Sequence, residues 1–524
     1  MFSFNKGMIY NQSRQNIWIA LIIFSLVILS ILLPRLYDTQ NVYAGELGGA
    51  NEITVCDFGC NATTITEAFT SSTLDITSGD TVRVLSGYDD TGETFPLTFP
   101  TSEIILSCED DELIASSTFD TAGYSGDTRI ELNTSSTLQN CNLANVTLTG
   151  CYDGITISGN TSATTTVTST IQNAACSNEP NYHWTVSNNS GFMGMSWVLP
   201  NNYTISSNTI YAYIDEIPGI SFVGPDGDTV NNTITNNTIY TRGVVAIEVT
   251  ESSSTTITNN KVLNESGSTD LIYLGLTNTS TVISGNYLQS DSMGVKGIRV
   301  SSGNHYNSAT ISSNTMLLAS GSENSEMSRG IEVDVDGASI VEITSQYNLF
   351  YATSTSGQVG ESLTASSTAS ITYTSSNNGY YNWTSATGTS VLGSGSINWS
   401  QSGTHRTTDP WLKSAASFPT SMQIAPHSLY HDYNIGADTG TRSTDPILID
   451  DIGTINYSSI HANSIDSTVK ANLKNNDTIT LAAGTYDAFS ISSALSGVTI
   501  GGAGATTIIN AGANESAITL TSFD

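Results

Sequence analysis

Hydrophobic and polar residues alternate in short stretches along the chain, and one stretch returns at regular intervals. Its clearest copy is Thr204-Ile-Ser-Ser-Asn-Thr-Ile-Tyr211, which is repeated from Thr233 to Tyr240 and from Thr256 to Leu263. The asparagine of the motif recurs in steps of 23 to 29 residues: Asn208, Asn237, Asn260, Asn286 and Asn314, with an earlier copy at Asn160. Self-similarity with such a period is typical of stacked repeat architectures.

A second stretch with apolar–polar–apolar alternation follows each copy after eight to fifteen residues. These stretches are Gly219 to Phe222, Ala246 to Val249, Leu271 to Leu274, Gly297 to Val300 and Gly330 to Asp334. Alternation with a period of two predicts half-buried strands. Each repeat is therefore expected to hold two or three short strands, and the variable step lengths to fall in turns.

Stacked repeats would pair each strand with the same strand of the next repeat, about 4.8 Å away. One column of inward side chains is then expected: Ile205, Ile234, Ile257, Ile283 and Ile311. The asparagines are expected to adopt the left-handed conformation of a sharp turn and to form an amide ladder along the axis. A merely Asn- and Thr-rich composition would not keep the Ile-x-x-Asn spacing. The pattern predicts an all-β parallel β-helix solenoid.

The first coil is expected to be covered by a short N-terminal capping helix. An amphipathic stretch from Thr64 to Leu74 precedes Ser78-Gly-Asp-Thr-Val to Tyr88, and a copy of this arrangement runs from Ile465 to Tyr486. A helix in this place shields the open edge of the first strands. The second copy predicts the start of another β-helix.

The chain resembles the right-handed parallel β-helix, or pectin-lyase-like, superfamily. The resemblance rests on Gly79-Asp80-Thr81-Val82 with Gly87-Tyr88, on the copy from Asp477 to Tyr486, and on the Ile-x-x-Asn coils. It covers about residues 52 to 350 and 460 to 524, and it implies a secreted polysaccharide lyase, hydrolase or epimerase, or a surface protein. The Asn-Thr-Asp, Gly-His-Gly and Arg-Ile-Lys motifs of polygalacturonase-type members do not occur.

These patterns predict four segments. Residues 1–44 form a signal peptide or membrane anchor, 45–440 a β-helix domain with an irregular C-terminal cap, 441–453 a linker, and 454–524 an incomplete second β-helix. The second β-helix stops after a few strands, so we expect the chain to be part of a longer tandem protein.

The N-terminal apolar run and the cysteines both indicate an exported protein. Residues 17–33 are apolar except for Ser25 and Ser30, and Val42-Tyr43-Ala44 is a possible cleavage site, so both a cleaved signal and an uncleaved anchor remain open. An even number of cysteines in an exported chain predicts disulfides. The expected pairs are Cys56–Cys60, Cys108–Cys141 and Cys151–Cys176. A zinc site at Cys56-x-x-x-Cys60 is the alternative, without a second ligand pair nearby.

Charge excludes some functions. The 524 residues carry 47 acidic and 15 basic side chains, a net charge of −32. Nucleic-acid binding needs a basic surface and is excluded, and docking on anionic lipid is disfavoured. Acidic groups such as Asp89-Asp90, Glu109 to Glu112 and Glu332 to Asp336 are candidates for Ca²⁺, although they equally fit a solvated acidic face, and no other cofactor is expected.

One outward position of the second stretch carries the main candidates for chemistry. Stacking would align these side chains, with Asp334 two residues further on: Ser221, Glu248, Tyr273, Arg299 and Glu332. Glu248, Glu332 and Asp334 are candidate catalytic carboxylates, because two such groups about 5 to 10 Å apart act as acid and base on a glycosidic bond. Tyr273 and Arg299 are candidate glycan-binding residues. The alternative is an exposed ladder with an Arg299–Glu332 surface pair.

A further candidate is the segment from Cys176 to Asn202, which appears as an insertion in the coil period. Its Trp184 and Trp197 would stack on sugar rings if they were exposed. The alternative is a loop packed over the coils. Two function classes result: a structural or adhesive surface protein that binds glycans, which we favour, and a polysaccharide lyase, glycoside hydrolase or epimerase.

Overall fold

A computed structural model of the chain describes most of the region between residues 51 and 520. The described residues are 51–86, 88, 93–109, 118–120, 129–144, 146–150, 152–162, 170–172, 183–198, 200–213, 217–224, 229–319, 327–352, 358–383, 385–407, 409–410, 412, 425–437, 442–445, 447–449, 464–491, 495–502, 507–510 and 518–520. The apolar run 17–33 lies outside them, and among the described residues no helix is long and apolar enough to cross a membrane.

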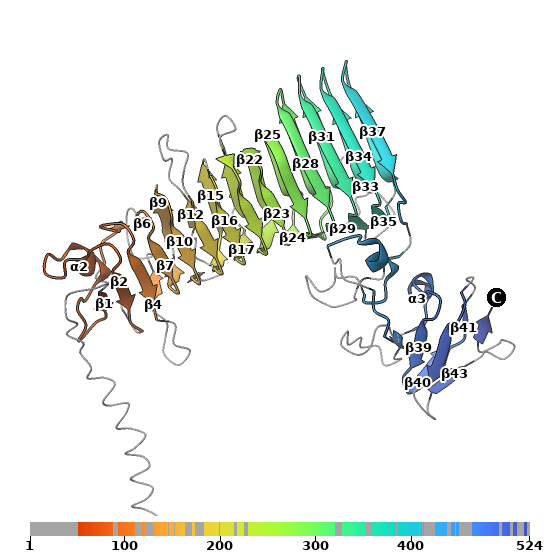
Figure 1. Cartoon of the computed structure of the whole chain (residues 1–524), viewed down its shortest axis with the longest axis horizontal. Helices are drawn as coiled ribbons and strands as arrows, with labels where there is room; N and C mark the ends of the chain where they lie inside the picture. Colours follow the sequence, from red (N-terminus) through yellow and green to blue (C-terminus); the bar gives the residue numbers. More distant parts are fainter. Residues whose placement is uncertain are drawn as a thin grey trace, which may run out of the picture.

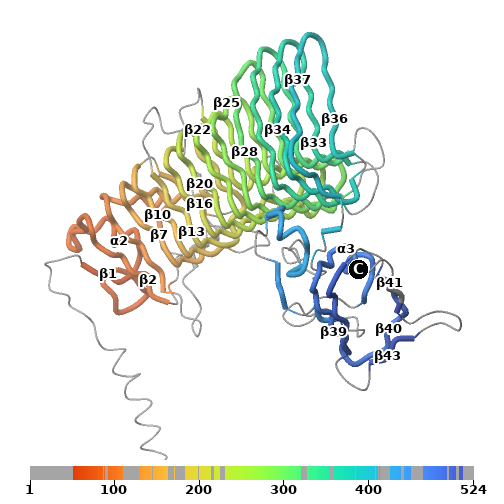
Figure 2. Tube along the Cα trace, turned by 45° about the vertical axis from the view of Figure 1, so that its right-hand side comes forward, coloured from red at the N-terminus to blue at the C-terminus, as the bar shows by residue number. Residues whose placement is uncertain are grey.

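The main body is a parallel β-helix, as the sequence predicts. Strands of successive coils pair in parallel over its whole length and stand in a row along the long axis (Figure 1). The chain winds repeatedly around this axis (Figure 2). Each coil contributes a strand to each of three faces, named here in the order in which the chain meets them in a coil such as residues 204–223.

The first face consists of β1 (Glu52–Val55), β2 (Thr81–Val84), β4 (Ile105–Cys108), β7 (Thr137–Gln139), β10 (Thr156–Ser158), β13 (Thr185–Ser187), β16 (Thr204–Ser206), β20 (Thr233–Thr235), β23 (Thr256–Thr258), the end of β25 (Asp270–Ser284), β28 (Tyr306–Ser312), β31 (Ile340–Gln346), β34 (Ser370–Ser376) and β37 (Ser396–Ser402). The second face consists of β5 (Thr118–Asp120), β8 (Asn142–Ala144), β11 (Thr161–Ser162), β14 (Ser190–Phe192), β17 (Thr209–Ala212), β21 (Thr238–Arg242), β24 (Lys261–Ser266), β26 (Tyr287–Ser290), β29 (Thr315–Leu318), β32 (Leu349–Ala352) and β35 (Gly379–Tyr381).

The third face consists of β3 (Leu97–Thr98), β6 (Arg129–Leu132), β9 (Thr147–Gly150), β12 (Thr170–Gln172), β15 (Gly194–Val198), β18 (Ile220–Val223), β22 (Ile247–Ser253), the start of β25, β27 (Lys296–Gly303), β30 (Ser328–Asp336), β33 (Gln358–Ala365) and β36 (Ser385–Val391), and the short β19 (Thr229–Val230) also pairs with β22. The stretches that the sequence analysis identified as second elements lie on this face.

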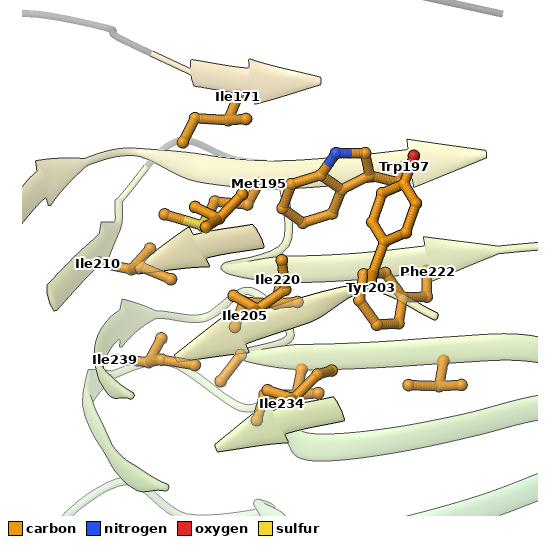
Figure 3. Packing of buried hydrophobic residues seen from close by; sticks show 14 of the residues in the cluster. Ile171, Met195, Trp197, Tyr203, Ile205, Ile210, Ile220, Phe222, Ile234 and Ile239 are labelled. Carbon is orange, nitrogen blue, oxygen red and sulfur yellow. The ribbon is translucent and has the colours of Figure 1, made fainter. Parts of the chain in front are cut away.

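The predicted isoleucine column is the core of the first face. Ile205 pairs with Ile234, Ile234 with Ile257, and the register continues through Ile283 to Ile311. All five side chains are fully buried. Figure 3 shows Ile205 and Ile234 packed against residues of the other two faces. Burying a side chain of this size stabilises the fold by about 1.5–3 kcal/mol.

The turn between the first and second faces contains the predicted amide ladder. The side-chain nitrogen of Asn237 donates to Oδ1 of Asn260 at 3.0 Å and to the backbone oxygen of Ile205 at 2.9 Å. The backbone nitrogen of Asn237 also donates to Oδ1 of Asn260 at 3.0 Å. The same pattern joins successive coils through Asn160, Asn189, Asn208, Asn237, Asn260, Asn286, Asn314, Asn348 and Asn378.

The left-handed residue of this turn is not the ladder asparagine, so that expectation is wrong. The residue before it has positive φ, for example Ser207 at 58°, Asn236 at 57° and Gly285 at 68°. This backbone conformation turns the next residue inward. The ladder asparagine is thereby buried and hydrogen-bonded, while a small or polar residue takes the strained position.

The helix at the N-terminal end is α2 (Ile65–Thr70), shorter than the predicted Thr64 to Leu74. Its Ile65 and Ala68 are buried against the first coil. The side chain of Thr64 accepts a hydrogen bond from the backbone nitrogen of Glu67 at 2.9 Å, which caps the helix. Buried Glu93 accepts two further N-terminal amides, those of Ile65 and Thr66. The capping role is confirmed.

Two predicted disulfides are present. Cys56 is bonded to Cys60 and Cys108 to Cys141, with Cα–Cα distances of 5.6 and 4.9 Å. Zinc at Cys56 and Cys60 is thereby contradicted, because both sulfur atoms are used. Cys151 and Cys176 lie outside the described residues.

The irregular segment after the last coil packs on the side of the solenoid. The 3₁₀ helix η4 (Leu429–Tyr433) places Tyr430 against Leu349 of the second face, together with Ile435. The backbone nitrogen of Gly436 donates to the oxygen of Tyr347 at 2.6 Å. Described residues of this segment therefore cover the part of the second face around Leu349.

A second, smaller set of parallel strands has its own core. It contains β38 (Ile447–Ile449), β39 (Thr478–Leu481), β40 (Gly484–Asp487), β41 (Phe489–Ile491), β42 (Thr499–Gly502), β43 (Thr507–Asn510) and β44 (Ile518–Leu520), with α3 (Ser467–Ala471) as its helix. The beginning of a second β-helix is confirmed. Strand β38 lies within 441–453, the segment expected as a linker, and pairs with β39.

The core becomes polar near the C-terminal end of the main solenoid. Ser345 and Ser375 replace isoleucine in the first-face column, and Glu361 replaces isoleucine in a third-face column. The Oε1 atom of Glu361 accepts hydrogen bonds from Ser345 Oγ at 2.6 Å, Tyr373 Oη at 3.0 Å and Asn378 Nδ2 at 3.1 Å. Glu361 is fully buried, and burial raises the pKa of its carboxyl.

The ladder makes a prediction about stability. Replacing Asn237 with Ala should lower the free energy of unfolding by at least about 2 kcal/mol, because several buried hydrogen-bonding groups on Asn208, Ile205 and Asn260 lose their partner. Asn236→Ser is the control, since Ser207 takes the same left-handed position. Thermal unfolding followed by circular dichroism measures both. Equal melting temperatures for the two variants would contradict the structural role of the ladder.

Glu361 makes a prediction about pH. Burial raises the pKa of Glu361 in the folded state. Above about pH 4.3 the unfolded state releases this proton while the folded state still holds it. The free energy of unfolding therefore falls as the pH rises from about 4.3 towards the folded pKa. Glu361→Gln should therefore melt near the wild-type temperature at pH 4 and above it at pH 8. Glu342→Gln, an exposed carboxylate on β31, is the control. A difference between wild type and Glu361→Gln that does not change with pH would refute this account.

Candidate functional site

The predicted outward column on the third face exists. The strand register pairs Ser221 with Glu248, Glu248 with Tyr273, Tyr273 with Arg299, and Arg299 with Glu332. Neighbouring members interact directly. Ser221 Oγ donates to Glu248 Oε2 at 2.9 Å, and the guanidinium carbon of Arg299 lies 6.0 Å from the ring centroid of Tyr273. The alternation of these strands thus places all five predicted side chains on one surface.

Arg299 is the centre of this surface. Its guanidinium group lies 3.6 Å from Glu332, 3.4 Å from Asp334 and 3.5 Å from Asp270, measured between the closest nitrogen and oxygen atoms. Glu332 is almost fully buried, whereas Asp334 is 43% exposed. The predicted Arg299–Glu332 pair is therefore one edge of a larger network.

A second column, three residues before the first, completes the network. Asp270 pairs in register with Lys296, and Lys296 with Arg329. The Lys296 ammonium lies 3.8 Å from Asp270, and Arg329 forms an ion pair with Glu332. The repeat of the second stretch did not reveal these three residues, because they lie three positions before its outward column. Their position three residues before Tyr273, Arg299 and Glu332 was the signal in the sequence that could have found them.

Six charged residues and Tyr273 together form what we call the charged patch. The charged residues are Asp270, Lys296, Arg299, Arg329, Glu332 and Asp334.

The charged patch is partly withdrawn from water. Burial raises the pKa of Asp270, and the opposite charges of Arg299 and Lys296 counteract it. Burial also lowers the pKa of Arg329, against the attraction of Asp334. Three cations and three carboxylates balance, so the patch is neutral on a chain with a net charge of −32. Its donors and acceptors are held in fixed positions by one another.

Glu248 and Glu332 do not form a catalytic pair. Three strand steps separate them, through Tyr273 and Arg299. At about 4.8 Å per step they are about 14 Å apart along the axis, beyond the spacing of paired glycosidase carboxylates. Their expected joint role as acid and base is therefore contradicted by the register.

Trp184 and Trp197 are core residues, which corrects their assignment as sugar-stacking side chains. The exposed fraction is 1% for Trp184 and 0% for Trp197. Trp184 stacks on Tyr203 with ring centroids 5.8 Å apart, and Trp197 meets Phe222 edge-on at 5.6 Å. Figure 3 shows Trp197, Tyr203 and Phe222 pointing into the coil.

The described part of the supposed insertion is also a regular coil. Residues 183–198 form β13, β14 and β15, and Asn189 is a ladder member. The sequence Thr185-Val-Ser-Asn-Asn189 matches the repeat when Val replaces Ile, which was the signal available.

The acidic groups proposed for Ca²⁺ are not gathered into a site where the structure describes them. Asp334 pairs with Arg299, while Asp336 accepts hydrogen bonds from Ser367 and from the backbone of Gly337. Within the described ranges no group of three or more His, Cys, Asp or Glu residues is arranged to hold a metal ion. Asp89, Asp90 and residues 110–112 lie outside these ranges.

Comparison with known proteins adds a distant similarity. No protein-family model matches the chain, and no curated protein matches it. A solved structure of the PL6 family alginate lyase AlyGC is similar over 90% of this chain and 71% of that chain, with 13% sequence identity and a TM-score of 0.24.

Proposed function

We propose that this chain is an exported β-helix protein of the pectin-lyase-like type that binds a polysaccharide at the charged patch without cleaving it. The patch carries the proposal. It gathers three of the chain's 15 basic side chains on β27 and β30, beside the half-buried ring of Tyr273. Disulfides and the apolar run 17–33 support export.

The chemistry of the patch suits a sugar chain. Sugar hydroxyls need both donors and acceptors at fixed positions, which paired Arg and Asp side chains provide, and an aromatic ring offers a face for stacking. The coils follow one another about every 4.8 Å along the axis, so an extended polymer lying along the third face would meet several members of the patch in turn. Adhesion to a hydroxyl-rich polysaccharide follows from this arrangement.

Turnover is the second candidate, and one observation favours it. Asp270 combines a raised pKa with a position beside Lys296 and Arg299, which is the kind of environment that general acid–base groups need. Against it stands the pairing of each carboxylate of the patch with a cation. A lyase, hydrolase or epimerase would use Asp270 or Glu332 as the proton-transferring group.

The test is a glycan array with the purified protein, followed by product analysis on the glycans that bind. Arg299→Gln should weaken binding about tenfold or more, because a hydrogen bond to a charged group contributes about 1.5–3 kcal/mol. Arg83→Gln is the matched control. Arg83 also pairs with two carboxylates across coils, Glu52 and Glu109, but lies near the N-terminal end.

The outcomes separate the two candidates. Binding that Arg299→Gln weakens and Arg83→Gln leaves intact, with no shortened products, supports the proposal. Products that disappear in Asp270→Asn would replace it with the enzymatic candidate. Binding that Arg299→Gln leaves unchanged would exclude the charged patch as the contact surface.

A further inference from the structure

The outward side of the first face is a regular array of hydroxyl groups. From β7 to β23, two outward columns run side by side, with the strands in unbroken register. The first column is Thr137, Thr156, Thr185, Thr204, Thr233 and Thr256, and the second is Gln139, Ser158, Ser187, Ser206, Thr235 and Thr258. Gln139 alone departs from Ser or Thr. We call these twelve positions the hydroxyl array.

The array is not a general property of the outer surface. On the second face of the same coils one outward column also carries hydroxyls, at Thr161, Ser190, Thr209 and Thr238, but it ends at Lys261. The other outward column of that face holds Tyr211, Tyr240 and Leu263. The third face carries the mixed column that leads to the charged patch. Two adjacent hydroxyl columns over six coils therefore distinguish the first face of these coils.

The array offers its hydroxyls to the outside. Its members from Thr204 to Thr258 are half-buried between neighbouring strands, and none is charged. Thr258 donates to Thr235 at 3.0 Å. The hydroxyls of Thr204, Ser206 and Thr233 have no partner among the residues that the structure describes. Threonine is β-branched and stiff about χ1, which restricts the positions of the Thr204 and Thr233 hydroxyls.

The spacing of the array resembles that of ice. In a tetrahedral water network with O···O distances of about 2.75 Å, second-neighbour oxygens lie about 4.5 Å apart and the perpendicular repeat is about 7.3 Å. Successive coils of the array are about 4.8 Å apart, and its two columns are about 6.7 Å apart. Both spacings agree within about 0.6 Å, and since every parallel sheet has them, the uniform hydroxyls are what distinguish this surface.

We propose that the hydroxyl array binds the surface of ice, with ordered water as its ligand. A rigid crystal plane requires a preordered surface, and six coils in constant register provide one about 24 Å long. The first column is interrupted at Val282, which pairs with Thr256. Beyond it, an open groove of about 550 Å³ lies on the outside of the first face, lined by Ser280, Val282, Ser308, Thr310, Glu342 and Thr344 among others.

A crystalline polysaccharide is a less suitable ligand for this array. Stacking on a sugar ring needs an aromatic face, and carboxylate and guanidinium groups make the stronger, charge-assisted hydrogen bonds to sugar hydroxyls. The twelve array positions contain neither, and Gln139 provides their single amide. The proposal is independent of the glycan site, because the charged patch lies on the third face of later coils.

The experiment measures ice binding by the purified protein. Slow freezing of a dilute solution onto a cold finger should draw the wild-type protein into the ice, and growing crystals should become faceted. Thr233→Tyr, in the middle of the array, should lose both effects because a ring standing above the plane separates the array from the crystal. Thr233→Ser keeps a hydroxyl and should retain most of them.

Thr238→Tyr is the matched control. Thr238 lies on the second face of the same coil and is equally half-buried, so the same substitution should leave ice binding unchanged. Melting temperatures confirm that each variant is folded. Exclusion of the wild-type protein from ice, or equal losses in Thr233→Tyr and Thr238→Tyr, would overturn the proposal. A third outcome would also overturn it: the wild-type protein sediments with microcrystalline cellulose and does not affect ice growth, and only Thr233→Tyr abolishes the sedimentation.

Discussion

The side-chain amide ladder is the interaction on which the rest of the structure depends. Each ladder asparagine satisfies groups on both neighbouring coils, so that one buried polar column fixes the register of all three faces. For Asn237 these groups belong to Asn208, Ile205 and Asn260. Constant register is also what the hydroxyl array and the charged patch require.

Both ends of the ladder are reinforced by other chemistry. At the start, the backbone of Cys141 donates to Asn160 in place of an asparagine, and the disulfide from Cys141 to Cys108 ties this coil to the preceding one. At the other end, Asn378 donates to Glu361 at 3.1 Å. The polar core around Glu361 therefore continues the hydrogen bonds of the ladder, which an isoleucine at this position could not accept. Because Glu361 titrates, we expect the stability of this end of the solenoid to depend on pH.

The three faces share one scaffold and differ in chemistry. The first carries uncharged hydroxyls, the second is partly covered by the segment around η4, and the third concentrates scarce cations against carboxylates. A neutral patch with fixed charges and an uncharged periodic array suit different ligands, one a flexible polymer and the other a rigid lattice. Different outward positions of the repeat face different sides of the solenoid. One repeat can therefore carry both the hydroxyl array and the charged patch.

The repeat pattern by itself determined the fold, because apolar alternation and the Ile-x-x-Asn spacing are local in the sequence and recur in every coil. It determined the inward isoleucines, the amide ladder, the capping helix and the column from Ser221 to Glu332, as well as two of the disulfides. The same column, with one member per coil, already separates Glu248 from Glu332 by three strand steps. Only the tertiary structure decided which residues outside this column meet it. It placed Trp184 and Trp197 in the core and joined Asp270, Lys296 and Arg329 to the column. These contacts depend on the direction and reach of individual side chains, which the period of the repeat does not fix.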